Sequence, residues 1–177
     1  MKNLNTVSIV IAFIAIVISG YCLYTTKSSK KQAYIELQKV FNEFEMTKQY
    51  KLKLESVVNA RKSIADSIEL DLTAQARVLK QTAKPASDKL QDFMYEKEMY
   101  MEKVMQFEQD NMALKQKYDA EINRQLNQYI KDYGLKNGYE FIYGADGSGA
   151  LMYAKESANI SPEITEYINK RYKGEPR

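Results

Sequence analysis

Midway along the chain, the stretch Thr82-Ala83-Lys84-Pro85-Ala86-Ser87-Asp88 carries the single proline of a long tract that contains no glycine. The glycine-free tract runs from residue 21 to residue 133 of the 177 residues. Glycine and proline are the residues that most often interrupt helices, so a tract that lacks them can form very long ones. The single proline then predicts a bend between two helical arms, with the tip near residues 82–88.

Apolar side chains recur at heptad spacing on both sides of this bend, as in a coiled coil. The first arm carries Tyr50, Leu54, Val57, Ile64 and Ile68, and the second carries Leu90, Phe93, Tyr100, Val104, Phe107, Leu114 and Tyr118. Three seam positions hold polar residues instead of apolar ones: Arg61, Lys97 and Asn111. The spacing predicts a long antiparallel helical hairpin over residues 45–133, with arms of some 60–70 Å at about 1.5 Å per residue.

Folding the arms back at Lys84 determines which seam residues face each other. The expected neighbours are Tyr50 and Tyr118, Leu54 and Leu114, Arg61 and Phe107, Ile64 and Val104, Ile68 and Tyr100, and Val78 and Leu90. The same register places Asp71 opposite Lys97, so that two polar interruptions of the seam become one candidate ion pair. It also brings Arg61 within reach of an aromatic ring for a cation–π contact.

Residues 32–44 and 134–173 flank the arms and are expected to form a small α+β body at the base of the hairpin. Weak alternation of apolar side chains predicts a short strand at residues 32–37. Segments 139–143 and 150–154 flank the turn-forming residues Asp146-Gly147-Ser148-Gly149, which predicts a β-hairpin. Because a helical hairpin returns the chain to its starting point, these pieces should meet.

A last helix is predicted to begin at Ser161-Pro162-Glu163. Serine suits the N-cap, proline the first helical position and an acid the first turn. The expected buried stripe of this helix consists of Ile164, Tyr167, Ile168 and Tyr172. The fold class is therefore mostly α, with long coiled-coil arms on a small base that contains a short β-sheet.

Residues 1–25 have the composition of a signal peptide or an N-terminal membrane anchor. The apolar run at residues 7–18 has the length of a secretory hydrophobic region. Counted on to Tyr24, it is marginally long enough to span a bilayer. Lys27, Lys30 and Lys31 follow it, and positive charges at this place resist export. We expect an exported chain, and both cleavage and retention of the segment stay open.

The composition excludes several classes of function. The chain has no histidine, and its only cysteine is Cys22, which excludes a Cys/His zinc site, a Cys/His or Ser/His/Asp catalytic group and an intramolecular disulfide. Lys and Arg number 26 against 23 Asp and Glu, and the net charge of +3 is spread along the chain. A nucleic-acid-binding protein would concentrate its basic residues. We expect no enzymatic activity, no cofactor, no metal and no nucleic-acid partner.

The order of elements resembles that of the periplasmic OmpH/Skp-type chaperones. The resemblance begins with the strand-to-helix segment at residues 33–44, continues through Thr47-Lys48 and residues 52–55, and resumes at residues 138–143 and 159–164. It implies a homotrimer with a small β body and three helical arms that enclose a cavity for unfolded outer-membrane β-barrel proteins. The N-terminus departs from the clean cleavable signal of that family, which leaves membrane contact through this segment open.

Four methionines form a candidate client-binding row on the second arm. Met94, Met101, Met105 and Met112 follow a 7-4-7 spacing beside the seam. Methionine side chains are flexible and polarizable, which suits a surface that adapts to different partners. The same row could instead broaden the core of the hairpin or form a contact between subunits, and the sequence leaves these interpretations open.

Three lysines gather about the predicted tip: Lys80, Lys84 and Lys89. They are either a basic tip that meets anionic lipid or an acidic client, or the solvated ends of two helices. Together with the helical hairpin, the resemblance to the OmpH/Skp-type chaperones implies an ATP-independent holdase of the bacterial periplasm that binds unfolded outer-membrane proteins. The alternative is a membrane-anchored coiled coil that spaces or links components of the cell envelope.

Overall fold

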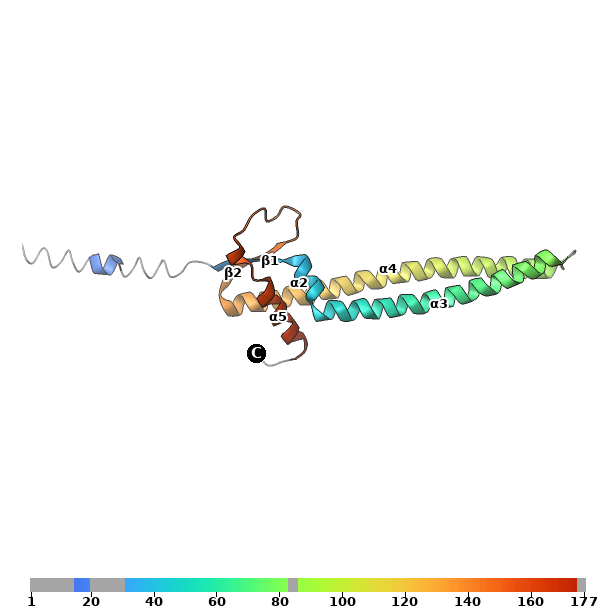
Figure 1. Cartoon of the computed structure of the whole chain (residues 1–177), viewed down its shortest axis with the longest axis horizontal. Coiled ribbons are helices and arrows are strands. Elements are labelled where there is room, and N and C mark those ends of the chain that lie inside the picture. Colours follow the sequence, from blue (N-terminus) through green and yellow to red (C-terminus); the bar gives the residue numbers. More distant parts are fainter. Residues whose placement is uncertain (1–14, 20–30, 83–85, 175–177) are drawn as a thin grey trace, which may run out of the picture.

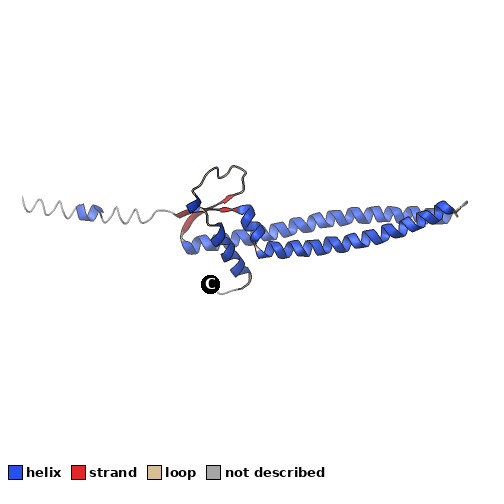
Figure 2. Cartoon of the chain, in the orientation of Figure 1, coloured by secondary structure: helices blue, strands red, loops and turns tan. Residues whose placement is uncertain are grey.

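The computed structural model describes residues 15–19, 31–82 and 86–174. A long helical hairpin extends from a small base, as Figure 1 shows. The elements of the base and hairpin are β1 (Lys31–Glu36), α2 (Leu37–Glu43), α3 (Glu45–Gln81), α4 (Ser87–Asn137), β2 (Tyr139–Ala145), η1 (Glu156–Ala158) and α5 (Ser161–Tyr172). The predicted fold class is confirmed, with helix dominating and a short sheet confined to the base (Figure 2).

The two arms are helices of unequal length. α3 has 37 residues and α4 has 51. α4 continues through Gly134, which is buried against β2. A Cβ at this position would lie 3.4 Å from the Ile142 side chain, so the glycine allows close packing of the helix on the strand. It ends at Gly138, which has the left-handed φ of 72° that helix C-termini favour in glycine. The residues around the bend, including Lys84 and Pro85, lie outside the described part of the chain.

A break at Phe44 separates α2 from the first arm. Its backbone is extended, with φ −67° and ψ 126°, and its N–H donates to the carbonyl of Val40 at 3.0 Å. The ring is fully buried and meets Tyr129 and Tyr172 edge to face, with ring centroids 6.2 and 5.5 Å apart. Helix therefore begins already at Leu37, and the chain turns at Phe44 to direct the arms away from the base.

The sheet of the base pairs β1 with β2 in parallel, so that Ala33 lies opposite Ile142 and Ile35 opposite Gly144. A parallel pair needs a long crossover connection, and here the whole helical hairpin is that connection. The predicted strand at residues 32–37 is confirmed, one residue earlier than expected.

The predicted strand at residues 150–154 is wrong. Beyond β2 the chain bends at Asp146, whose carboxylate accepts the N–H of Ser148 at 2.8 Å, and residues 150–154 run without strand pairing. Met152 and Tyr153 are 87% and 80% exposed, so the segment has no apolar surface of its own chain to pack against. The chain instead crosses to the other edge of β1, where Ile160 N–H donates to the Tyr34 carbonyl at 3.0 Å.

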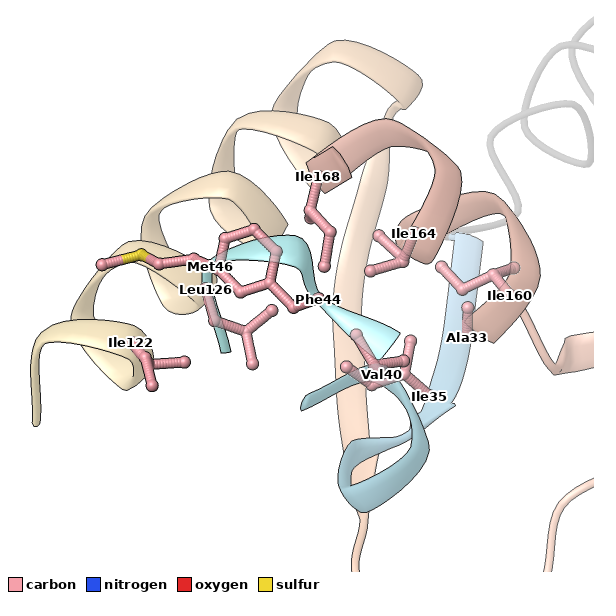
Figure 3. Packing of buried hydrophobic residues seen from close by; sticks show 10 residues of the cluster. All are labelled: Ala33, Ile35, Val40, Phe44, Met46, Ile122, Leu126, Ile160, Ile164 and Ile168. Carbon is pink, nitrogen blue, oxygen red and sulfur yellow. The ribbon is translucent and has the colours of Figure 1, made fainter. Parts of the chain in front are cut away.

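The hydrophobic core sits entirely in the base. Figure 3 shows its members converging from β1, α2, α5 and the base ends of the arms. They are Ala33, Ile35, Val40, Phe44, Met46, Ile122, Leu126, Ile160, Ile164 and Ile168. The predicted stripe of the last helix is confirmed, since Ile164 and Ile168 are fully buried while Tyr167 and Tyr172 pack against the same cluster.

Side-chain hydrogen bonds from helix α5 fix two junctions of the base, the one between β1 and α2 and the one between α2 and α3 at Phe44. Asn169 accepts the N–H of Glu45 at 2.8 Å and donates to the carbonyl of Glu43 at 3.1 Å, one on each side of Phe44. Ser161 Oγ accepts the N–H of Glu36 at the junction of β1 and α2. The predicted N-cap is wrong: α5 begins at Ser161 itself, with Ile160 at the N-cap and no side-chain cap, because the Ser161 hydroxyl is engaged at Glu36. Asn159 Oδ1 accepts the Ser161 N–H at 3.0 Å.

Candidate functional site

The arms differ from the base because almost nothing in them is buried. Among the described residues from 48 to 121, Leu72 alone is buried. The predicted seam residues Ile64, Val78 and Leu90 are among the exposed large apolar side chains. The two helices therefore touch along a thin seam and leave apolar surface in contact with water.

The four methionines of the candidate row all lie on this surface. Met94, Met101, Met105 and Met112 are 62%, 55%, 56% and 63% exposed. At about 100° per residue they fall within about 40° of one another around α4. Their exposure removes the interpretation that they widen the core of the hairpin. The row lies free on this chain, available either to a client or to another subunit.

Contacts across the seam follow the predicted register near the base and at mid-arm. The rings of Tyr50 and Tyr118 lie 4.4 Å apart between centroids. The guanidinium of Arg61 lies over the ring of Phe107, with Cζ 5.6 Å from the centroid, and also donates to Asn111. The two polar side chains that interrupt the apolar seam, Arg61 and Asn111, are thus hydrogen-bonded to each other across it.

Tyr50 links the arms close to the base through a hydrogen bond as well as a ring contact. Its hydroxyl donates to the carboxylate of Glu121 at 2.8 Å. This hydrogen bond, together with burial, raises the pKa of the Tyr50 phenol above its ordinary value. The neutral, protonated phenol is the form that the contact needs, so the link is intact at physiological pH.

The predicted ion pair of Asp71 and Lys97 is not among the ion pairs of the described residues. Asp71 accepts instead from the amide of Gln75 at 3.0 Å, and the same amide donates to Glu96 at 2.7 Å. Lys97 lines a hollow between the two arms, beside Leu72 of α3 and Tyr100 of α4. Gln75 bridges the arms at this level because its amide can serve one carboxylate from each helix.

Near the tip the arms enclose a cleft of about 440 Å³. It is lined by Ala74, Gln75, Val78, Leu79, Lys89, Asp92 and Glu96. Lys80 lies in the last turn of α3 and Lys89 in the first turns of α4, so both flank the tip, while Lys84 is outside the described residues. Asp92 and Glu96 on the cleft wall offset the positive charge on that side.

A second cleft, of about 420 Å³, lies where α2 meets the base ends of the arms. Its apolar wall includes Leu37, Phe41, Tyr50, Leu54, Tyr118 and Ile122. Sequence reasoning missed this cleft, because it depends on the turn at Phe44 that swings α2 away from α3. No spacing pattern in the sequence shows that turn.

The described part of the chain contains neither a metal-binding cluster nor a membrane-spanning helix. No group of three or more His, Cys, Asp or Glu side chains there could hold a metal ion. Nor does any helix in residues 15–19, 31–82 or 86–174 combine the length and apolar character needed to cross a membrane. The predicted signal or anchor at residues 1–25 falls mostly outside the described residues.

Comparisons with known proteins match both the base and the arms. The chain is 23% identical over 143 residues to the chaperone protein Skp of Yersinia enterocolitica, covering 78% of this chain and 85% of the relative. It is 22% identical over 149 residues to the chaperone protein Skp of Pectobacterium atrosepticum, covering 81% and 88%.

The fold is also that of a solved structure, a putative outer membrane chaperone (OmpH-like) from Caulobacter crescentus. The TM-score is 0.71 at 13% sequence identity, over 81% of this chain and 86% of that one. The profile of the family described as outer membrane protein (OmpH-like) matches residues 31–168, which include β1, both arms and most of α5. The chain therefore belongs to the OmpH-like outer membrane protein family.

Proposed function

We propose that this protein is an ATP-independent holdase that binds unfolded outer-membrane β-barrel proteins in the periplasm. The observation that carries the proposal is the exposed methionine row on α4, on arms that bury almost none of their own apolar surface. Large exposed apolar surfaces on a folded protein commonly mark binding sites. The names of the Skp relatives, both chaperone proteins, favour the same function.

Holding a client in this way needs no chemical step. Unfolded segments bind the apolar flank of the arms and are thereby kept from associating with one another. Arms with a thin, partly polar seam change their separation at low cost, because few buried contacts oppose opening. The sequence has no phosphate-binding loop, so release would come from competition by a better acceptor rather than from a nucleotide cycle. In this proposal the protein is a binding protein and not an enzyme.

We further propose that three chains assemble through the base. Within the described residues the outer edge of β2 has no strand beside it, and an unpaired edge readily accepts another strand. Phe141 and Tyr143 project half-exposed from β2, with ring centroids 5.9 Å apart. Met152 and Tyr153, which follow β2 in the sequence, are largely exposed as well. A solution mass of three chains is the expected result, and a monomer at micromolar concentration would contradict the assembly.

The N-terminal segment is proposed to direct the chain to the periplasm and, if retained, to keep the protein at the inner membrane. The lysines of the tip would then add a second, electrostatic contact with anionic lipid or with acidic segments of clients. A mass measurement on the exported protein distinguishes these cases, because cleavage removes the apolar run at residues 7–18.

The test of the proposed function is suppression of aggregation without nucleotide. A β-barrel protein diluted from urea should scatter light when alone and stay soluble with a molar excess of this protein. A structural spacer, the rival function, would leave the scattering unchanged. A folded water-soluble protein of similar size serves as the control, since crowding alone stabilises compact states only weakly.

A further inference from the structure

The methionine row has a composition that makes it sensitive to oxidation. The positions that share this flank of α4 are spaced alternately by four and three residues: Met94, Glu98, Met101, Met105, Glu108 and Met112. Both glutamates are exposed, as are the four methionines. Thioether side chains are therefore the sole apolar groups on this flank over about five helical turns.

We propose that the row is a modification site at which oxidants of the peroxide class convert Met94, Met101, Met105 and Met112 to methionine sulfoxide and so weaken the holding of clients. The effect on holding rests on the proposed function. Access of the oxidant rests on exposure, which the row shares with Met99 and Met152 and which the buried Met46 lacks. The loss of holding is therefore the effect that we assign to the row.

The chemistry of the step is an oxygen-atom transfer from hydrogen peroxide. The sulfur lone pair attacks one peroxide oxygen, the S–O bond forms and the O–O bond breaks. The sulfur loses two electrons and the peroxide gains them. The proton on the transferred oxygen passes to the departing hydroxide, so that one sulfoxide and one water result. Sulfoxide formation turns a flexible apolar side chain into a polar one.

Oxidation should change the flank without unfolding the arms. The seam of α4 uses other residues, among them Phe93, Val104 and Phe107, which lie on a different side of the helix. The row makes no part of the core cluster of the base. Modification would thus replace every apolar group of the flank by a polar one while the hairpin keeps its packing.

Met46 provides an internal control within the same chain. It is 8% exposed and belongs to the core of the base. Hydrogen peroxide is added to the full-length protein, and peptide mass spectrometry follows the gain of one oxygen at each methionine. The four row methionines should oxidise at least about tenfold faster than Met46. Equal rates at all five residues would overturn the assignment of the row as an accessible modification site.

The consequence for holding is tested with a variant that cannot be oxidised in the row. Met94→Leu, Met101→Leu, Met105→Leu and Met112→Leu together keep the flank apolar, while the exposed Met99 stays as in the parent. Each protein is compared with its own untreated form. Peroxide treatment should weaken suppression of aggregation by about tenfold or more in the parent, whereas the treated and untreated leucine variant should suppress aggregation to the same extent. Circular dichroism should show the same helicity for both.

The outcomes separate this inference from the proposed function. If the untreated parent does not suppress aggregation, the proposed function fails and the consequence for holding fails with it. If the untreated parent suppresses aggregation and its oxidised form does so equally well, the inference alone is overturned. Equal loss in the parent and the leucine variant would assign the effect to methionines outside the row, which also overturns it.

Discussion

Replacing Met94, Met101, Met105 and Met112 together by glutamine is expected to lower affinity for unfolded clients by about 30- to 1,000-fold. Full burial of a methionine side chain is worth roughly 1.5–3 kcal/mol, and a client covers only part of each exposed side chain. A combined loss of about 2–4 kcal/mol follows, and about 1.4 kcal/mol corresponds to a tenfold change. Binding is measured by fluorescence anisotropy of a labelled β-barrel protein kept unfolded in low urea.

The leucine version of the same four substitutions is the matched control for this result. Leucine, methionine and glutamine are all good helix formers, so the far-ultraviolet circular dichroism of both variants should equal that of the parent. The leucine variant should bind as the parent does, because the flank stays apolar. Full affinity in the glutamine variant, at unchanged helicity, would remove the row from the binding surface.

Phe44→Ala is expected to destabilise the base by about 3–5 kcal/mol. Phe44 is fully buried, makes edge-to-face contacts with Tyr129 and Tyr172, and occupies the break where α2 turns into α3. Truncation removes these contacts and leaves a cavity at the centre of a small core. Because most domains are stable by only about 5–15 kcal/mol, the base should unfold at much lower denaturant concentration, as followed by tyrosine near-ultraviolet circular dichroism.

Leu52→Ala in the first arm is the control for Phe44→Ala. Leu52 is exposed on α3, so its truncation should change the free energy of unfolding by less than about 0.5 kcal/mol. A loss below about 1 kcal/mol in the Phe44 variant would mean that the base does not depend on the core centred at this ring.

These contrasts divide the molecule into two parts with different physical tasks. The base carries the core and the hydrogen bonds of α5, which fix the chain at Glu36 and on both sides of Phe44. The arms carry few buried contacts and a seam joined by polar bridges such as that of Gln75. Stability is thus concentrated in the base, and the arms can use their apolar surface for binding.

The sequence predicts the hairpin well because helix-breaking residues act locally. The absence of glycine over residues 22–132 leaves two long helices as the natural structure. Heptad spacing then sets the register, and the contacts of Tyr50 with Tyr118 and of Arg61 with Phe107 confirm it. The Asp71–Lys97 pair does not form, because a neighbouring glutamine amide binds Asp71 and long side chains at a surface have several partners within reach.

The base is harder to predict because its strands pair across the length of the chain. Residues 150–154 have strand-forming composition, yet β2 pairs with β1 in parallel and leaves them unpaired. Local composition cannot distinguish a hairpin from a segment that crosses to another edge. The turn at Phe44 could not be predicted for the same reason. Its extended backbone results from burial of its ring among residues more than 80 positions away in the sequence.

The role of the methionine row could be only partly anticipated from spacing. The 7-4-7 pattern shows that the four side chains share one side of α4, but it does not show whether a second helix covers that side. In the structure of the single chain all four side chains are exposed, so neither α3 nor the base covers them.

The central claim is that unfolded clients lie against the methionine flank of the arms. A photo-crosslinking amino acid at position 101 tests it, with position 103 as the control, because Lys103 is exposed and lies about 160–200° around α4 from the row. With an unfolded β-barrel protein bound, position 101 should form crosslinks to the client in large excess over position 103. Equal crosslinking at the two positions, or crosslinks from position 101 to other copies of the chain alone, would contradict the account.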